Sequence, residues 1–120
     1  LAFTYQNETM EKRVRPLAES VAADQLLECD VADDASVERV FAELGKAWGT
    51  VDFLVHAVAY SDKNELTGRY VDTSAANFTQ TMAISCYSFT ALAQRARSPV
   101  ASCVSQTRSP VAATRHRSWP

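Results

Sequence analysis

The chain has 120 residues, of which 47% are hydrophobic and 22% charged, a composition typical of one ordinary globular domain and not of a disordered chain. Its formal net charge of -2 is unevenly distributed, because residues 1–96 carry all 14 acidic residues whereas residues 97–120 carry arginines and no acid. The acidic charge of residues 1–96 argues against nucleic acid as the main partner, since phosphate binding needs a cationic face.

Membrane and disulfide signals are also missing from the sequence. No run approaches the roughly 18 apolar residues that a membrane-spanning helix needs. The cysteines, Cys29, Cys86 and Cys103, are odd in number and too widely spaced for a disulfide framework or a metal clip. We therefore expect reduced cysteines, no membrane partner and a cytoplasmic protein.

The first predicted elements are a strand, a helix and a second strand. Residues 1–5 favour a β-strand, and a helix is expected over 8–23, after the cap residue Asn7. Pro16 should bend or split this helix, because proline removes a donor and clashes with the preceding turn. The second strand is expected over residues 25–29.

The next predicted elements are a helix and a buried strand. The helix should start at a cap residue, Asp34 or Ser36, and run to Trp48, with Gly49 just past its end. Residues 51–59 are almost continuously apolar, which is typical of a parallel strand covered on both faces. We expect this strand to lie centrally in the sheet.

A polar loop over residues 60–72 separates that strand from a long helix. This helix should be capped by Thr73 or Ser74 and extend to about Arg95. It carries a mostly apolar stripe that suits close packing against another helix. The stripe consists of Phe78, Met82, Ser85, Phe89 and Leu92.

Alternation of strands and helices predicts an α/β fold with a parallel, Rossmann-like sheet over residues 1–96. Residues 97–120 are different, because they repeat Arg-Ser-Pro-Val-Ala and lack apolar periodicity. Such a segment cannot bury enough surface to offset the entropy of ordering, so we expect an irregular, disordered tail. A shifted reading frame joined to a truncated gene would explain it; a natural interaction tail is the alternative.

Residues at the strand ends are the candidates for ligand binding, because they border the crevice of an open parallel sheet. Gln6 could reach the adenosine half of a dinucleotide, and Glu8 nearby would repel the extra phosphate of NADP. Asp30 could accept hydrogen bonds from the adenine amino group while Val31 packs on the ring. The alternatives are a solvated turn residue for Gln6 and a helix-entry residue for Asp30.

Polar residues also follow the third predicted strand. Tyr60, Ser61, Asp62 and Lys63 could line a substrate pocket or form a plain surface loop. His56 has no second His or Cys at ligand spacing, so we interpret it as a packed histidine and expect no metal site.

Two arrangements that would support catalysis are missing. The only glycines are Gly45, Gly49 and Gly68, and none opens a helix after a strand, so the phosphate-binding half of a dinucleotide site is absent. Ser85 and Ser88 have no recognisable triad partners, which disfavours nucleophilic hydrolysis.

Five segments form the most specific pattern of the chain. They are Phe3-Thr4-Tyr5-Gln6, Lys12-Arg13-Val14-Arg15-Pro16-Leu17-Ala18-Glu19, Glu28-Cys29-Asp30-Val31, Asp52-Phe53-Leu54-Val55-His56-Ala57-Val58-Ala59 and Ile84-Ser85-Cys86-Tyr87-Ser88-Phe89. In their order and spacing they resemble the NADH-dependent enoyl-[acyl-carrier-protein] reductases of bacterial fatty-acid synthesis. That family belongs to the short-chain dehydrogenase/reductase superfamily.

The resemblance implies a cofactor, a substrate and an assembly. It implies NADH, an enoyl-acyl-carrier-protein substrate and a homotetramer whose interface includes the helix from Ser74. It places NADH contacts at Gln6, Asp30, Val31 and Val58, and the wall of the enoyl pocket at Ser61, with Tyr60 bordering it.

Two parts of the family pattern have no counterpart. The first strand with its glycine-rich turn would precede Leu1, and the catalytic Tyr and Lys would follow Arg95, so no catalytic residue is expected here. Tyr5 and Lys12 show the family's Tyr-x6-Lys spacing, but we interpret this as coincidence, because Tyr5 lies on a strand directed at adenosine.

We therefore predict a partial Rossmann-like domain with strands 2, 3 and 4, derived from a reductase and itself inactive. In the strand order 3-2-1-4 the first strand lies between residues 1–5 and 51–59, so its absence should leave the chain unstable or aggregated. The alternatives are a pseudoenzyme that docks onto full-length subunits and another dehydrogenase that acts on a hydroxyl or keto group.

Overall fold

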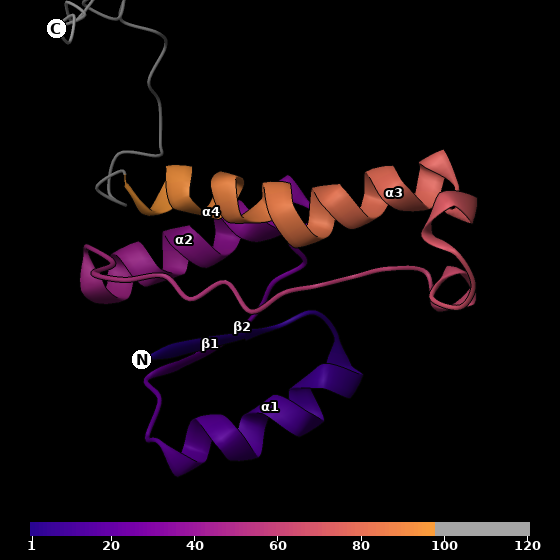
Figure 1. The fold of residues 1–120 in the computed structure, drawn as a ribbon. Coiled ribbons are helices and arrows are strands. Elements are labelled where there is room, and N and C mark those ends of the chain that lie inside the picture. The colour runs from indigo at the N-terminus through magenta and orange to yellow at the C-terminus, as the bar shows by residue number, and fades with distance from the viewer. Residues whose placement is uncertain (98–120) are drawn as a thin grey trace, which may run out of the picture.

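The structure is a computed structural model that describes residues 1–97; of the basic tail predicted to be disordered over residues 97–120, residues 98–120 lie outside the described residues. It is an α/β arrangement, as predicted. Figure 1 shows a small sheet with helix α1 on one side and helices α2, α3 and α4 on the other. No helix among the described residues is long and apolar enough to cross a membrane.

The N-terminal part is a strand, helix, strand unit. Strands β1 (Ala2–Tyr5) and β2 (Gln25–Glu28) pair in parallel, and α1 (Glu8–Ser20) connects them. The side chain of Asn7 caps α1, as expected, by accepting a hydrogen bond from the Met10 amide at 3.1 Å.

The predicted split at Pro16 does not occur, because α1 continues through this residue. Proline removes only one hydrogen bond of the helix, and the turns on either side keep theirs. Packing of α1 against β1 and β2, with Ala18 buried, supplies further stabilisation.

Helix α2 (Asp34–Trp48) forms as predicted, with Gly49 at its end, but its cap is a different residue. The side chain of Asp33 accepts from the Ala35 amide at 3.0 Å, so the predicted cap, Asp34 or Ser36, is wrong. The Ser36 hydroxyl is engaged elsewhere. The inner face of α2 supplies most of the buried core, which contains Val37, Val40, Phe41 and Leu44 together with Cys29 and Leu92.

The strand predicted over residues 51–59 is not formed. This segment pairs with no described strand, and the described sheet has the order β1-β2. The prediction of cover on both faces is also wrong, because Phe53 and Val55 are 66% and 75% exposed while Leu54 and His56 are half-buried. A continuous apolar run indicates burial only when the partner strands and covering helices are present.

The C-terminal part is one long helix of three segments, α3 (Ala75–Met82), the π-helical turn η3 (Ala83–Tyr87) and α4 (Ser88–Ala96). Ser74 caps it, as one of the two predicted candidates, by accepting from the Asn77 amide at 3.1 Å. Two 3-10 turns, η1 (Lys63–Glu65) and η2 (Tyr70–Asp72), lie in the loop before it. Helix α4 packs against α2.

Candidate functional site

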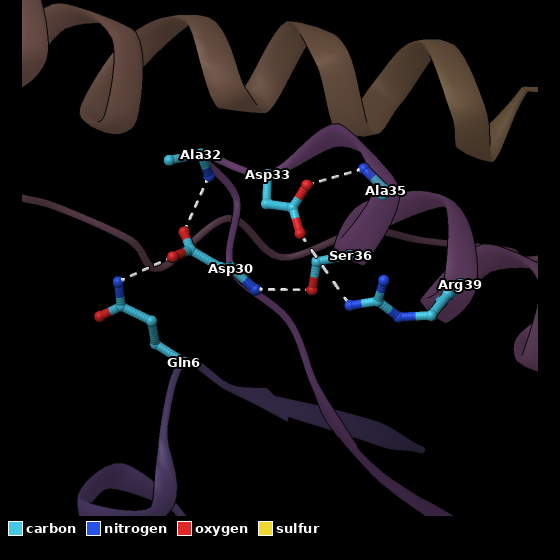
Figure 2. Close-up of polar contacts among 7 residues, drawn as sticks. All are labelled: Gln6, Asp30, Ala32, Asp33, Ala35, Ser36 and Arg39. Atoms are coloured by element: carbon cyan, nitrogen blue, oxygen red, sulfur yellow. Dashed lines mark hydrogen bonds and ion pairs between the residues drawn. The ribbon is translucent and has the colours of Figure 1, made fainter.

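The carboxyl ends of the two paired strands bring Gln6 and Asp30 together. Gln6 follows β1 and Asp30 lies two residues after β2, so the parallel pairing places both at the same edge of the sheet. The Gln6 Nε2 donates to Asp30 Oδ2 at 3.3 Å, as Figure 2 shows. These two predicted residues therefore form one polar cluster.

Local hydrogen bonds fix the orientation of Asp30. Its Oδ1 accepts from the Ala32 amide at 2.9 Å, and its own amide donates to Ser36 Oγ at 3.0 Å (Figure 2). Ser36 is only 3% exposed, so its hydroxyl is held firmly. The longest of these bonds, from Gln6 to Oδ2, is the easiest for a ligand to replace.

Ser36 is a residue that the sequence did not reveal in this role. The sequence suggests that Ser36 is a helix cap, because it follows Asp33 and Asp34 where a helix is expected to start. The true cap is Asp33, whose second carboxylate oxygen lies 4.0 Å from Arg39 Nη2 in an exposed ion pair. Such an exposed pair contributes little stability.

Val31 and Cys29 flank Asp30 and connect it to the core. Val31 is half-buried and packs against the α2 cluster, which leaves part of its apolar surface accessible. Burial raises the pKa of the Cys29 thiol, and the neighbouring Asp30 carboxylate raises it further. This cysteine is therefore a protonated packing residue rather than a nucleophile.

A second polar cluster lies where the extended segment ends. The Ser85 hydroxyl accepts from the Tyr60 amide at 3.0 Å and donates to the Tyr60 carbonyl oxygen at 3.2 Å. One side chain thus satisfies both backbone groups of Tyr60, as a neighbouring strand would. Ser85 lies in the π-helical turn η3, and such turns often occur at functional sites.

Asn77 holds the loop that follows Tyr60. Its Oδ1 accepts from the Asp62 amide at 2.9 Å, and its Nδ2 donates to Ser61 Oγ at 3.3 Å and to Glu65 Oε2 at 3.2 Å. Only 6% of Asn77 is exposed. The loop is thus fastened to α3, and Ser61 has a defined position within it.

Glu65 fastens the same loop to the start of α3. Its carboxylate accepts from the Ser74 amide at 2.9 Å and from the Ser74 hydroxyl at 2.8 Å. These hydrogen bonds, the amide first, lower the pKa of Glu65 below its ordinary value.

His56 is a packed and hydrogen-bonded histidine, as interpreted from the sequence. Its Nε2 lies 2.7 Å from Ser88 Oγ, and its ring meets Phe89 edge-on at 5.6 Å. Ser88 directs its own proton to the Ile84 carbonyl oxygen at 2.6 Å, so it accepts from His56 and is no activated nucleophile.

The remaining predicted residues are placed as follows. Val58 is half-buried in the extended segment. Lys12 pairs with Glu8 at 3.0 Å on the exposed surface of α1. Among residues 1–97, no cluster of three or more His, Cys, Asp or Glu could hold a metal ion.

Comparison with known proteins decides the family. The model of a family described as enoyl-(acyl carrier protein) reductase matches residues 1–114. The chain belongs to this family. Enoyl-[acyl-carrier-protein] reductase [NADH] 2 of Rhizobium meliloti is 56% identical over 96 residues, which are 80% of this chain and 36% of that protein.

Similarity to solved structures supports the same family assignment. An enoyl-(acyl-carrier-protein) reductase from Anaplasma phagocytophilum in complex with NAD is 58% identical, with a TM-score of 0.75 over 79% of this chain and 36% of its own. The NADH enoyl-[acyl-carrier-protein] reductase of Aquifex aeolicus is 40% identical, with a TM-score of 0.76 over 80% of this chain and 38% of its own. The predicted resemblance and Rossmann-like fold class are confirmed, and the chain spans about a third of its relatives' length.

Proposed function

We propose that residues 1–96 form the adenosine side of an NADH site and part of an enoyl pocket, in an enzyme that reduces the double bond of enoyl-acyl-carrier-protein thioesters. The observation that supports this most directly is the meeting of Gln6 and Asp30 at the carboxyl edge of the sheet, in a chain 56% identical to an NADH reductase. NADH, when bound, supplies the hydride for the reduction.

The Asp30 cluster fits the adenine ring. A carboxylate oxygen held only by a 3.3 Å contact is available to accept from an exocyclic amino group, and Gln6 adds an adjacent amide. The half-buried Val31 offers an apolar surface for the ring face. Because Ser36 and the Ala32 amide already orient Asp30, little ordering is needed upon binding.

Tyr60, Ser61 and Val58 are the proposed contacts at the other half of the site. Val58 would pack against the cofactor, Ser61 would line the enoyl pocket and Tyr60 would border it. The hydrogen bonds from Ser85 and Asn77 support these roles, because they fix the backbone of Tyr60 and the hydroxyl of Ser61. The outward residues Phe78, Met82 and Phe89 are exposed, which suits a homotetramer interface on this helix.

We predict that the isolated chain neither turns over substrate nor binds NADH in the micromolar range. The glycines described at positive φ, Gly49 and Gly68, lie at the end of α2 and in a loop, and neither opens a helix that could receive a pyrophosphate. The activity is therefore tested in a chimera in which residues 1–96 replace the matched part of the Rhizobium meliloti reductase.

The chimera should oxidise NADH with crotonyl thioester, and Asp30→Asn should raise KM for NADH about 10-fold or more, since a bond to a charged acceptor is lost. Asp24→Asn, at an exposed aspartate just before β2 and so at the opposite end of that strand from Asp30, is the matched control and should leave KM unchanged. A folded but inactive chimera would refute the proposed activity. An active one in which Asp30→Asn leaves KM for NADH unchanged would refute the adenosine assignment.

A further inference from the structure

The last turn of α4 meets the first turn of α2. Leu92 is buried in the core that α2 supplies, and Ala96 packs against that core. Figure 1 shows α4 alongside α2, and Figure 2 shows the first turn of α2 beside Asp30. The end of one helix therefore lies next to the segment that carries the proposed adenosine contact.

Arg95 makes a polar contact between these two turns. Its Nη2 donates to Asp34 Oδ1 at 2.9 Å and lies 3.9 Å from Glu38 Oε1. Its Nη1 donates to the Ala91 carbonyl oxygen at 3.2 Å, within its own helix. Since only 21% of the Arg95 side chain is exposed, these contacts fix the guanidinium between the two helices.

The charges on α2 explain why a cation is useful at this place. Asp34 and Glu38 stand four positions apart on α2, and like charges at that spacing destabilise a helix. The Arg95 guanidinium offsets this repulsion, because it pairs with both carboxylates. The pairing also suits the helix dipoles, since a cation in the last turn of α4 and an anion in the first turn of α2 are each favourable.

The first turn of α2 is in turn bonded to Asp30. Ser36 Oγ accepts from the Asp30 amide at 3.0 Å, and the Asp33 amide donates to the Asp30 carbonyl oxygen at 3.1 Å. The hydrogen bonds and ion pairs of Arg95 within residues 1–97 go to α2 and α4. Its influence on Asp30 therefore passes through this turn.

We propose that Arg95 is a positioning residue for the adenosine side of the NADH site. From α4 it holds the first turn of α2, and this turn holds Asp30. The role in cofactor binding rests on the proposed function, whereas the effect on the Asp30 amide does not. An ion pair to a carboxylate as exposed as Asp34, at 84%, contributes little stability. Loss of Arg95 should therefore change the placement of Asp30 rather than unfold the chain.

The test uses the chimera that carries residues 1–96 and measures kcat and the KM values for NADH and crotonyl thioester. Arg95→Gln should raise KM for NADH at least about 3-fold, an effect typical of a residue that acts on a site indirectly, and leave the other two parameters unchanged. Arg95→Lys keeps a cation that can pair with Asp34, so its KM for NADH should stay within about 2-fold of the unchanged chimera. Lys46→Gln is the matched control, because Lys46 pairs with Glu43 at 2.7 Å in the last turn of α2, at the far end of that helix from Asp30.

Two further measurements separate this role from a general loss of structure. Asp34→Asn should also raise KM for NADH, and its combination with Arg95→Gln should raise KM no further than one change alone, because both remove the same contact. NMR-detected amide exchange at Asp30 should be at least about 3-fold faster in Arg95→Gln and unchanged in Lys46→Gln. Additive effects of the two changes, an equal change in all three kinetic parameters or an unaltered Asp30 amide would overturn the inference. An inactive chimera in which Arg95→Gln still accelerates exchange at Asp30 would refute the proposed function and leave the action of Arg95 on Asp30 intact.

Discussion

Asn77 is the residue on which most of the loop between Tyr60 and α3 depends. Its amide group contacts the Asp62 amide, Ser61 and Glu65 from a position that is 6% exposed. Loss of a buried hydrogen-bonding group of this kind costs about 1–3 kcal/mol, because its partners are left unsatisfied.

We therefore predict that Asn77→Ala accelerates hydrogen exchange at the Asp62 amide by roughly 5- to 150-fold, the factor that corresponds to this free energy. Asn64→Ala is the control, because the hydrogen bond that the structure gives the Asn64 side chain within residues 1–97 is local, to the exposed Asp62. Mass spectrometry of exchanged peptides measures both. Equal acceleration in the two variants would show that Asn77 has no special role.

At the residue scale, the sequence predicted which site residues lie near each other better than it predicted which residues hold them in place by hydrogen bonds. Gln6 and Asp30 could be paired in advance, because parallel strands end at a common edge. Ser36, Asn77 and Ser85 could not, because their partners lie 6 to 25 positions away in the chain and meet only after the helices pack. A serine or asparagine near a helix start otherwise suggests only a cap.

At the scale of elements, most boundaries set by local chemistry were predicted, although the α2 cap, Asp33, was not. The caps at Asn7 and Ser74 and the helix end at Gly49 depend on side chains within a few residues of each boundary. Residues 51–59 show the limit, because a strand is defined by its partner and no local pattern supplies one. The π-helical turn η3 was also missed, since nothing in its sequence distinguishes it from α-helix.

The hydrogen bonds between Glu65 in the loop and Ser74 at the start of α3 should depend on pH, because the Glu65 carboxylate can be protonated. Its pKa is lowered in the folded state by the Ser74 amide and hydroxyl, so the carboxylate stabilises the fold above its ordinary pKa of 4.5. This contribution is lost as pH falls below that value through the folded pKa. We predict that the Ser74 amide resonance shifts over this acidic range.

Glu65→Gln provides the control for this titration. The glutamine keeps an oxygen that can accept from Ser74 but has no proton to gain, so the pH-dependent shift at Ser74 should disappear. NMR titration of the Ser74 amide in both proteins is the measurement. A midpoint at or above 4.5, or a shift that persists in the variant, would contradict the assignment.

At the scale of the whole molecule, the fold class was predictable because it follows from element order. Strand and helix alternate through β1, α1, β2 and α2, and this order leads to a parallel sheet. The burial of the apolar side chains could not be predicted from element order, because it depends on which other elements pack against each strand and helix. Large apolar side chains are exposed on several surfaces, among them Phe53, Val55, Leu66, Phe78 and Phe89.

These exposed surfaces lead to a prediction for the isolated chain. A two-stranded sheet is marginally stable, and the unpaired edges of β1 and residues 51–59 promote association between molecules. We expect residues 1–97, purified alone, to aggregate or to unfold on heating without a sharp transition. Circular dichroism at several concentrations, with light scattering, measures both behaviours. A monomer that unfolds sharply on its own would show that the α2 and α4 core suffices, and that neither edge limits stability.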